Sequence, residues 1–239
     1  MIKITKELYF LLKYGRTDNT VPYSIRDIAI TLILYIATVI FSIISVAIFF
    51  KLIVLEIPNN NFLKYLREKD FTYTIIVGVI FSPVFEEIRH RLCLVYSPFN
   101  FALMLGSWTY FTLGFIIEYK DIIGHNNYFG YQIVLFPIIV SVVYLYLRIY
   151  KYTNVFLAKF WLTYPKYIFY TFLFSFSLLH IINFSFELRL LIIFPLLTLP
   201  QTIGGIFFSY ARLKYGIIYS ILLHSMNNLF FTFLDFYGK

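Results

Sequence analysis

The sequence is dominated by long apolar runs that contain no Asp, Glu, Lys or Arg. A bilayer-spanning helix needs about 20 predominantly apolar residues, and most of these runs are close to that length. Because lipid offers no hydrogen-bond partners to an exposed backbone, such runs must be helical. The sequence therefore predicts an all-α, polytopic integral membrane helical bundle of about seven transmembrane helices. The apolar runs are Ile28–Phe50, Phe71–Phe85, Pro98–Ile117, Gly130–Leu147, Tyr167–Phe186, Leu190–Ala211 and Gly216–Leu234.

The chain is more apolar than an ordinary soluble domain, with 60% hydrophobic and 13% charged residues. The connections between the runs are too short to fold alone, so we interpret residues 1–239 as a single membrane domain. Interfacial loops are predicted at Glu56–Asp70, Glu118–Phe129 and Arg148–Lys166. Bends are predicted at or beside Pro83, Pro137, Pro195 and Pro200, and close helix contact at Gly204 and Gly205.

The opening segment, residues 1–25, begins MIKITKELYFLLKYGR and combines lysines with an apolar middle. Lys13 interrupts that apolar stretch and no small-residue cleavage site follows, which argues against a secretory signal peptide. We expect an amphipathic helix that lies in the membrane interface, with its lysines towards anionic head groups. The residues expected to face lipid are Leu8, Phe10, Leu11 and Leu12.

The net charge of +8 raises the question of nucleic-acid binding. Lys and Arg lie between the predicted spans, however, where they set the orientation of a multi-pass protein. Most of them fall on one side if the N-terminus is cytoplasmic. We therefore predict a multi-pass membrane protein with a cytoplasmic N-terminus, membrane lipids around it and no nucleic-acid partner. Cys93 has no second cysteine with which to form a disulfide or a CxxC metal site, so we expect it to serve packing.

Three of the predicted spans carry ionisable or amide side chains, and an ionised group near the bilayer centre costs about 2.5–3.5 kcal/mol on insertion scales. Phe71–Phe85 reaches spanning length only by continuing through EEIRHR, in which Glu87 and Arg91 are four residues apart and share a helix face. We interpret these two as a structural ion pair. Glu86 points about 100° away from Glu87. The other polar side chains are His180, His224 and Asn228.

Each of these groups taken singly is typical of packing or of contacts between helices. Gathered in one cavity, they would satisfy one another. A carboxylate can deprotonate water, and an imidazole can pass the proton to a leaving nitrogen. A second imidazole and an amide N–H can stabilise the developing oxyanion. The set Glu86, His180, His224 and Asn228 therefore contains the parts needed to hydrolyse a peptide bond.

The same residues resemble a family signature. EEIRHR has the form EExxxR, FSLLH (Phe176–His180) the form FxxxH, and HSMNN the form HxxxN. In this order they resemble the CAAX protease and bacteriocin-processing (CPBP) family, which consists of intramembrane endopeptidases related to the type II CAAX prenyl protease. The resemblance covers Thr74–Leu94 and Thr171–Phe233, within a CPBP-like catalytic core at residues 72–235.

The resemblance implies that Glu86 is the general base, acting on water with His180, and that His224 and Asn228 form the oxyanion site. Glu87 and Arg91 are then the supporting pair, and no metal is required. The chain departs from the family pattern at the end of the first motif, EEIRHR, where an aromatic residue followed by Arg-Gly is common and this sequence reads HRL. The interval between Glu86 and His180 is also long enough to hold two additional helices.

Three alternatives remain open from the sequence. In the first, the cavity is non-catalytic, as in a membrane binding or bacteriocin-immunity protein of the same family. Buried Glu and His residues also suit a proton-coupled transporter. Zinc held by Glu86, His180 and His224 is a third possibility, because a His₂Glu ligand set is typical of catalytic zinc. The expected substrate is a peptide or a membrane protein, and the residue usage is typical of an AT-rich bacterial genome, which favours a bacterial inner (plasma) membrane.

Overall fold

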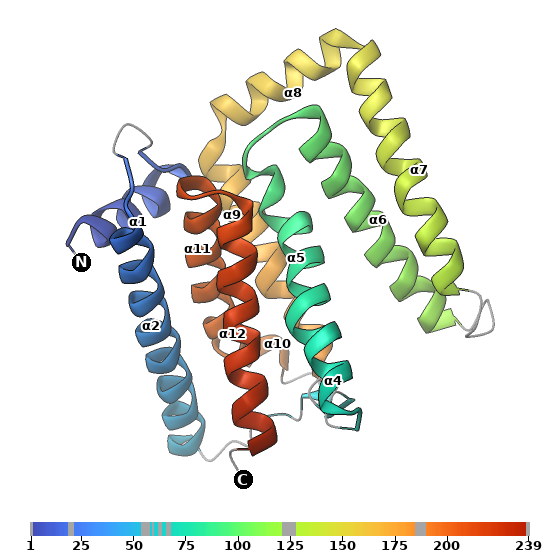
Figure 1. Ribbon diagram of the computed structural model, residues 1–239. Helices are drawn as coiled ribbons and strands as arrows, with labels where there is room; N and C mark the ends of the chain where they lie inside the picture. The colour runs from blue at the N-terminus through green and yellow to red at the C-terminus, as the bar shows by residue number, and fades with distance from the viewer. Residues whose placement is uncertain are drawn as a thin grey trace. The chain divides into compact units, whose positions relative to one another are not determined.

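The computed structural model describes residues 2–18, 22–53, 58, 60–61, 64–65, 68–120, 128–184 and 190–237. Regular structure in these residues is helical, with one isolated antiparallel bridge between Asn60 and Phe184, which confirms the all-α class. The chain forms two compact units, Met1–Val84 with Lys166–Lys239 and Phe85–Pro165. The positions of the two units relative to one another are not determined, so each is described by itself (Figure 1).

The first unit is built from helices at both ends of the chain. Its elements are α1 (Ile2–Tyr14), α2 (Ile25–Leu52), α4 (Phe71–Thr74), η1 (Ile75–Phe81), α9 (Pro165–Leu179), η3 (His180–Asn183), α10 (Leu190–Leu197), α11 (Leu199–Lys214) and α12 (Ile217–Tyr237). Helix α11 packs against α2 on one side and α12 on the other, as Figure 1 shows. Helix α5 (Ser82–His90) continues from η1 and contains the boundary between the units.

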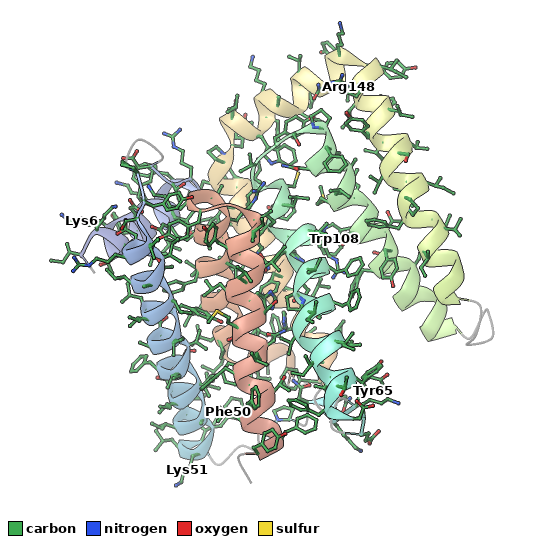
Figure 2. All side chains as sticks on the ribbon, viewed as in Figure 1. Lys6, Phe50, Lys51, Tyr65, Trp108 and Arg148 are labelled. Carbon is green, nitrogen blue, oxygen red and sulfur yellow. The ribbon has the colours of Figure 1, made fainter. Side chains whose placement is uncertain are left out.

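Helix α2 shows how one span is specified locally. Its N-cap Ser24 and Asp27 form a reciprocal capping box. Its buried residues recur every three or four positions and form one stripe: Thr31, Tyr35, Val39, Ser42, Val46 and Phe50. Large apolar side chains on the other faces, among them Phe41 and Ile44, are exposed as expected of a surface that meets lipid. Figure 2 shows Lys6 of α1 near the start of α2 and Lys51 at its other end.

Four helices in the described part of the chain are long and apolar enough to span a bilayer: Ile25–Leu52, Phe71–Leu94, Pro165–Asn183 and Ile217–Leu234. The bent pair Ile133–Ile149 and Lys151–Thr163 brings the count to five if it is one span. These helices indicate a multi-pass membrane protein. The predicted number of about seven spans is not confirmed.

Two predicted boundaries are wrong. The run Leu190–Ala211 is not one helix, because α10 ends at Leu197 and α11 begins at Leu199. Pro200 has no N–H to continue the backbone ladder, which explains the break. The predicted loop Arg148–Lys166 contains the helix α8 (Lys151–Thr163), bent by 98° from the preceding helix. It has no Gly or Pro to stop it before Pro165. The predicted loops Glu56–Asp70 and Glu118–Phe129 fall partly outside the described residues.

The N-terminal helix forms as predicted, but part of its predicted lipid face is wrong. Leu11 is 0% exposed and lies on one buried stripe of α1 with Ile4 and Glu7. Helix α1 packs on α11 and α2. Helix α11 covers this stripe. The Glu7 carboxylate accepts a hydrogen bond from the Tyr210 hydroxyl of α11 and lies 3.2 Å from Lys214 Nζ of the same helix.

The second unit contains the end of α5, η2 (Leu92–Leu94), α6 (Pro98–Lys120), α7 (Tyr128–Ile149) and α8. Helices α6 and α7 lie side by side (Figure 1). A Cβ at Gly106 would lie 2.6 Å from Val140 Cγ2, so the close approach of these helices requires glycine. Trp161 Nε1 donates to the Cys93 carbonyl at 2.6 Å and fixes α8 to η2. The thiol of Cys93 is buried, in line with a packing role.

Candidate active site

Glu86 lies on a helical run that begins after the N-cap Asp70 and continues through α4, η1 and α5. Asp70 accepts a hydrogen bond from the Tyr73 N–H at 2.7 Å, which satisfies one N–H of the first turn. The middle of the run, η1, is a π-helix in which the Ser82 N–H bonds to the Val77 carbonyl, five residues earlier. Such segments occur frequently at functional sites.

The π-helix leaves the Gly78 carbonyl without a backbone donor in its register, and the Asn228 side chain supplies one. With Ser82 bonded to Val77, the next donor in the same register, five residues after Gly78, is Pro83, which has no N–H. Asn228 Nδ2 of α12 donates to the Gly78 carbonyl at 2.8 Å. A buried carbonyl without a partner is costly, so this bond joins α12 to η1. It agrees with the interpretation of an Asn as a contact between helices.

A hydrogen-bond chain fixes the orientation of the Asn228 amide. The Tyr35 hydroxyl donates to Asn227 Oδ1 at 2.5 Å, and Asn227 Nδ2 donates to Asn228 Oδ1 at 3.1 Å. The Asn228 oxygen therefore accepts within α12 while its nitrogen faces η1. An amide nitrogen has two N–H groups, and Gly78 takes one of them. The other retains the donor capacity that an oxyanion site requires.

His180 and His224 each contact the ring of Phe176. The Phe176 ring centroid lies 4.7 Å from that of His180 and 5.9 Å from that of His224. His224 is 4% exposed and stacks on Phe208 with centroids 4.5 Å apart. Both imidazoles therefore contact the same phenyl ring within the first unit, and their gathering in one cavity stays a prediction.

The local structure of His180 differs from the prediction of an α-helical span through Phe186. Helix α9 ends at Leu179, and His180 begins the 3₁₀ turn η3. Its Nδ1 lies 2.8 Å from the Phe176 carbonyl. A carbonyl can only accept, so Nδ1 carries the proton in this contact. In the neutral ring, Nε2 is then the basic nitrogen.

The second unit holds the carboxylates. Arg91 Nη1 lies 3.3 Å from Glu87 Oε1, and both residues are 0% exposed, which confirms the predicted ion pair. His90 Nδ1 lies 3.0 Å from the Glu86 backbone carbonyl and its ring meets Trp108 edge-on at 5.2 Å. The Glu86 side chain is half-buried.

The six predicted site residues are thus divided between the units. Glu86, Glu87 and Arg91 belong to Phe85–Pro165, whereas His180, His224 and Asn228 belong to the other unit. The partial clusters within each unit are described above. The approach of Glu86 to the two imidazoles stays a prediction. Within each unit, the described His, Cys, Asp and Glu residues form no group of three that would hold a metal ion.

Sequence reasoning gave no role to Arg89, Tyr35 or Asn227. Arg89 is 6% exposed, and its guanidinium lies over Phe111 at 4.2 Å and Trp108 at 5.7 Å. The sequence feature that could have identified Arg89 as a functional residue was its place within a predicted span, three residues after Glu86. Tyr35 and Asn227 gave no such signal, because their contact joins positions 192 residues apart.

Comparisons of the chain with protein-family models, curated proteins and solved structures gave no match.

Proposed function

We propose that this protein is an intramembrane glutamic endopeptidase of the CPBP type. The observation that carries the proposal is that the His180 and His224 rings both contact Phe176 in a multi-pass membrane protein. Asn228 follows His224 by one helical turn. Of these three side chains His224 is buried and the other two are half-buried, and each has a use in peptide hydrolysis.

In the proposed reaction, Glu86 removes a proton from a water molecule, whose oxygen attacks the peptide carbonyl carbon. His224 and the remaining Asn228 N–H stabilise the negative charge that develops on the carbonyl oxygen. The carbon–nitrogen bond then breaks, and the proton is transferred to the leaving nitrogen. His180 positions the water through Nε2, because Nδ1–H is held by the Phe176 carbonyl. Products are a new carboxyl group and a new amine.

The adjacent carboxylates have different tasks in this mechanism. Glu87 is neutralised by Arg91, so it supports the helix rather than the chemistry. Glu86, about 100° around the same helix, supplies the base. No step requires a metal, and we therefore expect hydrolysis to persist after chelation and dialysis. Loss of hydrolysis on chelation and its recovery with zinc would instead favour the ligand set Glu86, His180 and His224.

The decisive experiment compares E86Q with the wild type in cells and in proteoliposomes. New peptide termini in membrane proteins are identified by mass spectrometry. We expect termini that require wild-type protein, disappear in E86Q and H180A, and persist in E68Q. Glu68 is exposed and gives the same chemical substitution away from the site. An identical set of termini in E86Q with normal folding would contradict the proposal and leave the non-catalytic binding or immunity function.

The setting we propose is a bacterial plasma membrane with the N-terminus in the cytoplasm. The support is the distribution of Lys and Arg around the spans, beginning with the basic helix α1. The substrate is a peptide or a membrane protein. Reporter fusions at the N-terminus test the orientation, since a reporter active only in the cytoplasm should be active there.

A further inference from the structure

Arg89 is a buried cation that the proposed reaction does not use. It is 6% exposed, within the candidate span Phe71–Leu94. Arg91, two residues later, faces another side of the helix and pairs with Glu87. A buried guanidinium within a membrane span needs a compensating partner, and this requirement marks functional positions.

The defined contacts of Arg89 are aromatic. Its guanidinium carbon lies 4.2 Å from the Phe111 ring centroid and 5.7 Å from that of Trp108, both on α6. Figure 2 shows Trp108 on that helix. Aromatic rings interact with the face of the guanidinium plane, whereas its N–H donors point outward in the plane. The rings therefore hold the group in place without satisfying its hydrogen bonds.

The hydrogen-bonding capacity of Arg89 is incompletely used. Its Nε–H is buried and has no hydrogen-bond partner among the described residues. Glu86 attracts the guanidinium electrostatically but supplies no acceptor to this N–H. An unsatisfied buried donor costs about 1–3 kcal/mol, more for a charged group. A ligand with two coplanar acceptor oxygens matches the fork of Arg.

We propose that Arg89, held against Trp108 and Phe111, binds a carboxylate of the peptide substrate. This inference deepens the proposed function and rests on it. Arg89 follows Glu86 by three residues, so the two share a helix face and are separated by about 4.5 Å along the axis. A carboxylate bound at Arg89 therefore belongs to a residue within about two positions of the bond that Glu86-activated water attacks. An acidic side chain or a free chain end supplies the same chemistry.

Binding to the E86Q protein tests this site without requiring catalysis. The probes are three dye-labelled Leu/Ala peptides of about 20 residues, a length that spans a bilayer. One carries a central Glu and an amidated C-terminus, the second replaces Glu by Gln, and the third has Gln with a free C-terminal carboxylate. Affinities are measured by fluorescence anisotropy in maltoside micelles. We expect one carboxylate peptide to bind about tenfold more tightly than the amidated Gln peptide.

The tighter binding of the carboxylate peptide, relative to the amidated Gln peptide, should vanish in E86Q/R89Q and persist in E86Q/R148Q. Arg148 is an exposed arginine at the end of α7 in the same unit (Figure 2). The peptide that shows the advantage identifies the source, the Glu side chain or the chain end. Equal binding of all three peptides to E86Q would overturn the proposal, and so would an advantage that R89Q leaves intact. The comparison among peptides on E86Q remains decisive even if R89Q does not fold.

These results separate two failures. If wild-type protein generates no new termini but the carboxylate preference depends on Arg89, the endopeptidase proposal fails and the binding site stands. If termini appear but show no nearby acidic residue or chain end, and the peptides bind equally, the endopeptidase stands and the Arg89 site fails.

Discussion

Two buried ion pairs of this protein differ in how the chain makes them. Glu87 and Arg91 are one turn apart on α5 and lie 3.3 Å from each other. Glu7 and Lys214 come from α1 and α11, and their closest atoms are 3.2 Å apart. The first pair forms whenever its helix forms, whereas the second requires the fold. The comparison teaches that local pairs stabilise an element, and distant pairs fix one element on another.

Breaking the local pair should have the largest effect. R91M leaves the Glu87 carboxylate buried without its cation, and we expect a loss of about 3–5 kcal/mol in the free energy of unfolding. The double variant E87M/R91M should recover most of that loss, because it removes both charges. Denaturant titration in mixed micelles measures both, with the exposed-site variant R148M as control. A double variant as unstable as R91M would contradict the role of the pair.

The distant pair should matter less, because Glu7 keeps a second partner. In K214M the carboxylate still accepts the Tyr210 hydrogen bond, and we expect a loss of about 2–3 kcal/mol. The same variant should release α1, so trypsin should cut between α1 and α2 faster than in the wild type. K166M, at an exposed lysine, serves as the control. Unchanged cleavage in K214M would show that α1 is held by its apolar stripe alone.

A third variant sharpens the comparison at the π-helix. N228A leaves the Gly78 carbonyl without its donor, for an expected loss of about 1–2 kcal/mol. P83A returns a backbone N–H five residues after Gly78. The N228A substitution should therefore cost less stability in the P83A protein than in the wild type. Unfolding titrations of the two single variants and the double variant measure this coupling. Strict additivity would contradict the explanation from the missing proline N–H.

The smallest effect is expected at the surface pair Lys3–Asp27, whose atoms are 2.8 Å apart. The hydrogen bond to Asp27 raises the pKa of Lys3 above its ordinary value of 10.5. This contribution to stability is complete below pH 10.5 and is lost as the pH rises through the higher folded-state pKa. Thermal unfolding between mildly and strongly alkaline pH should show a small decline that K3M reduces. An identical decline in K3M would assign it to other groups.

The sequence was informative where the cause of structure is local. Apolar runs predicted helices, and four-residue spacing predicted the Glu87–Arg91 pair. It was less informative about boundaries, because the 3₁₀ turn at His180 and the helix at Lys151–Thr163 have only weak local signals. The buried face of α1 and the Asn228–Gly78 bond depend on residues far along the chain, whose proximity one sequence does not reveal. The gathering of the polar side chains was predicted from the cost of burying them separately, and that argument gave no geometry such as the contact of both histidines with Phe176.

Gly106 has a consequence for how this protein tolerates change. Even alanine would bring a methyl group to 2.6 Å from Val140 Cγ2, well inside normal contact distance. Val140 is β-branched and has little rotamer freedom with which to withdraw. The spacing of the α6–α7 hairpin is therefore set by the size of a hydrogen atom, and saturation mutagenesis should find this position reserved for a single amino acid.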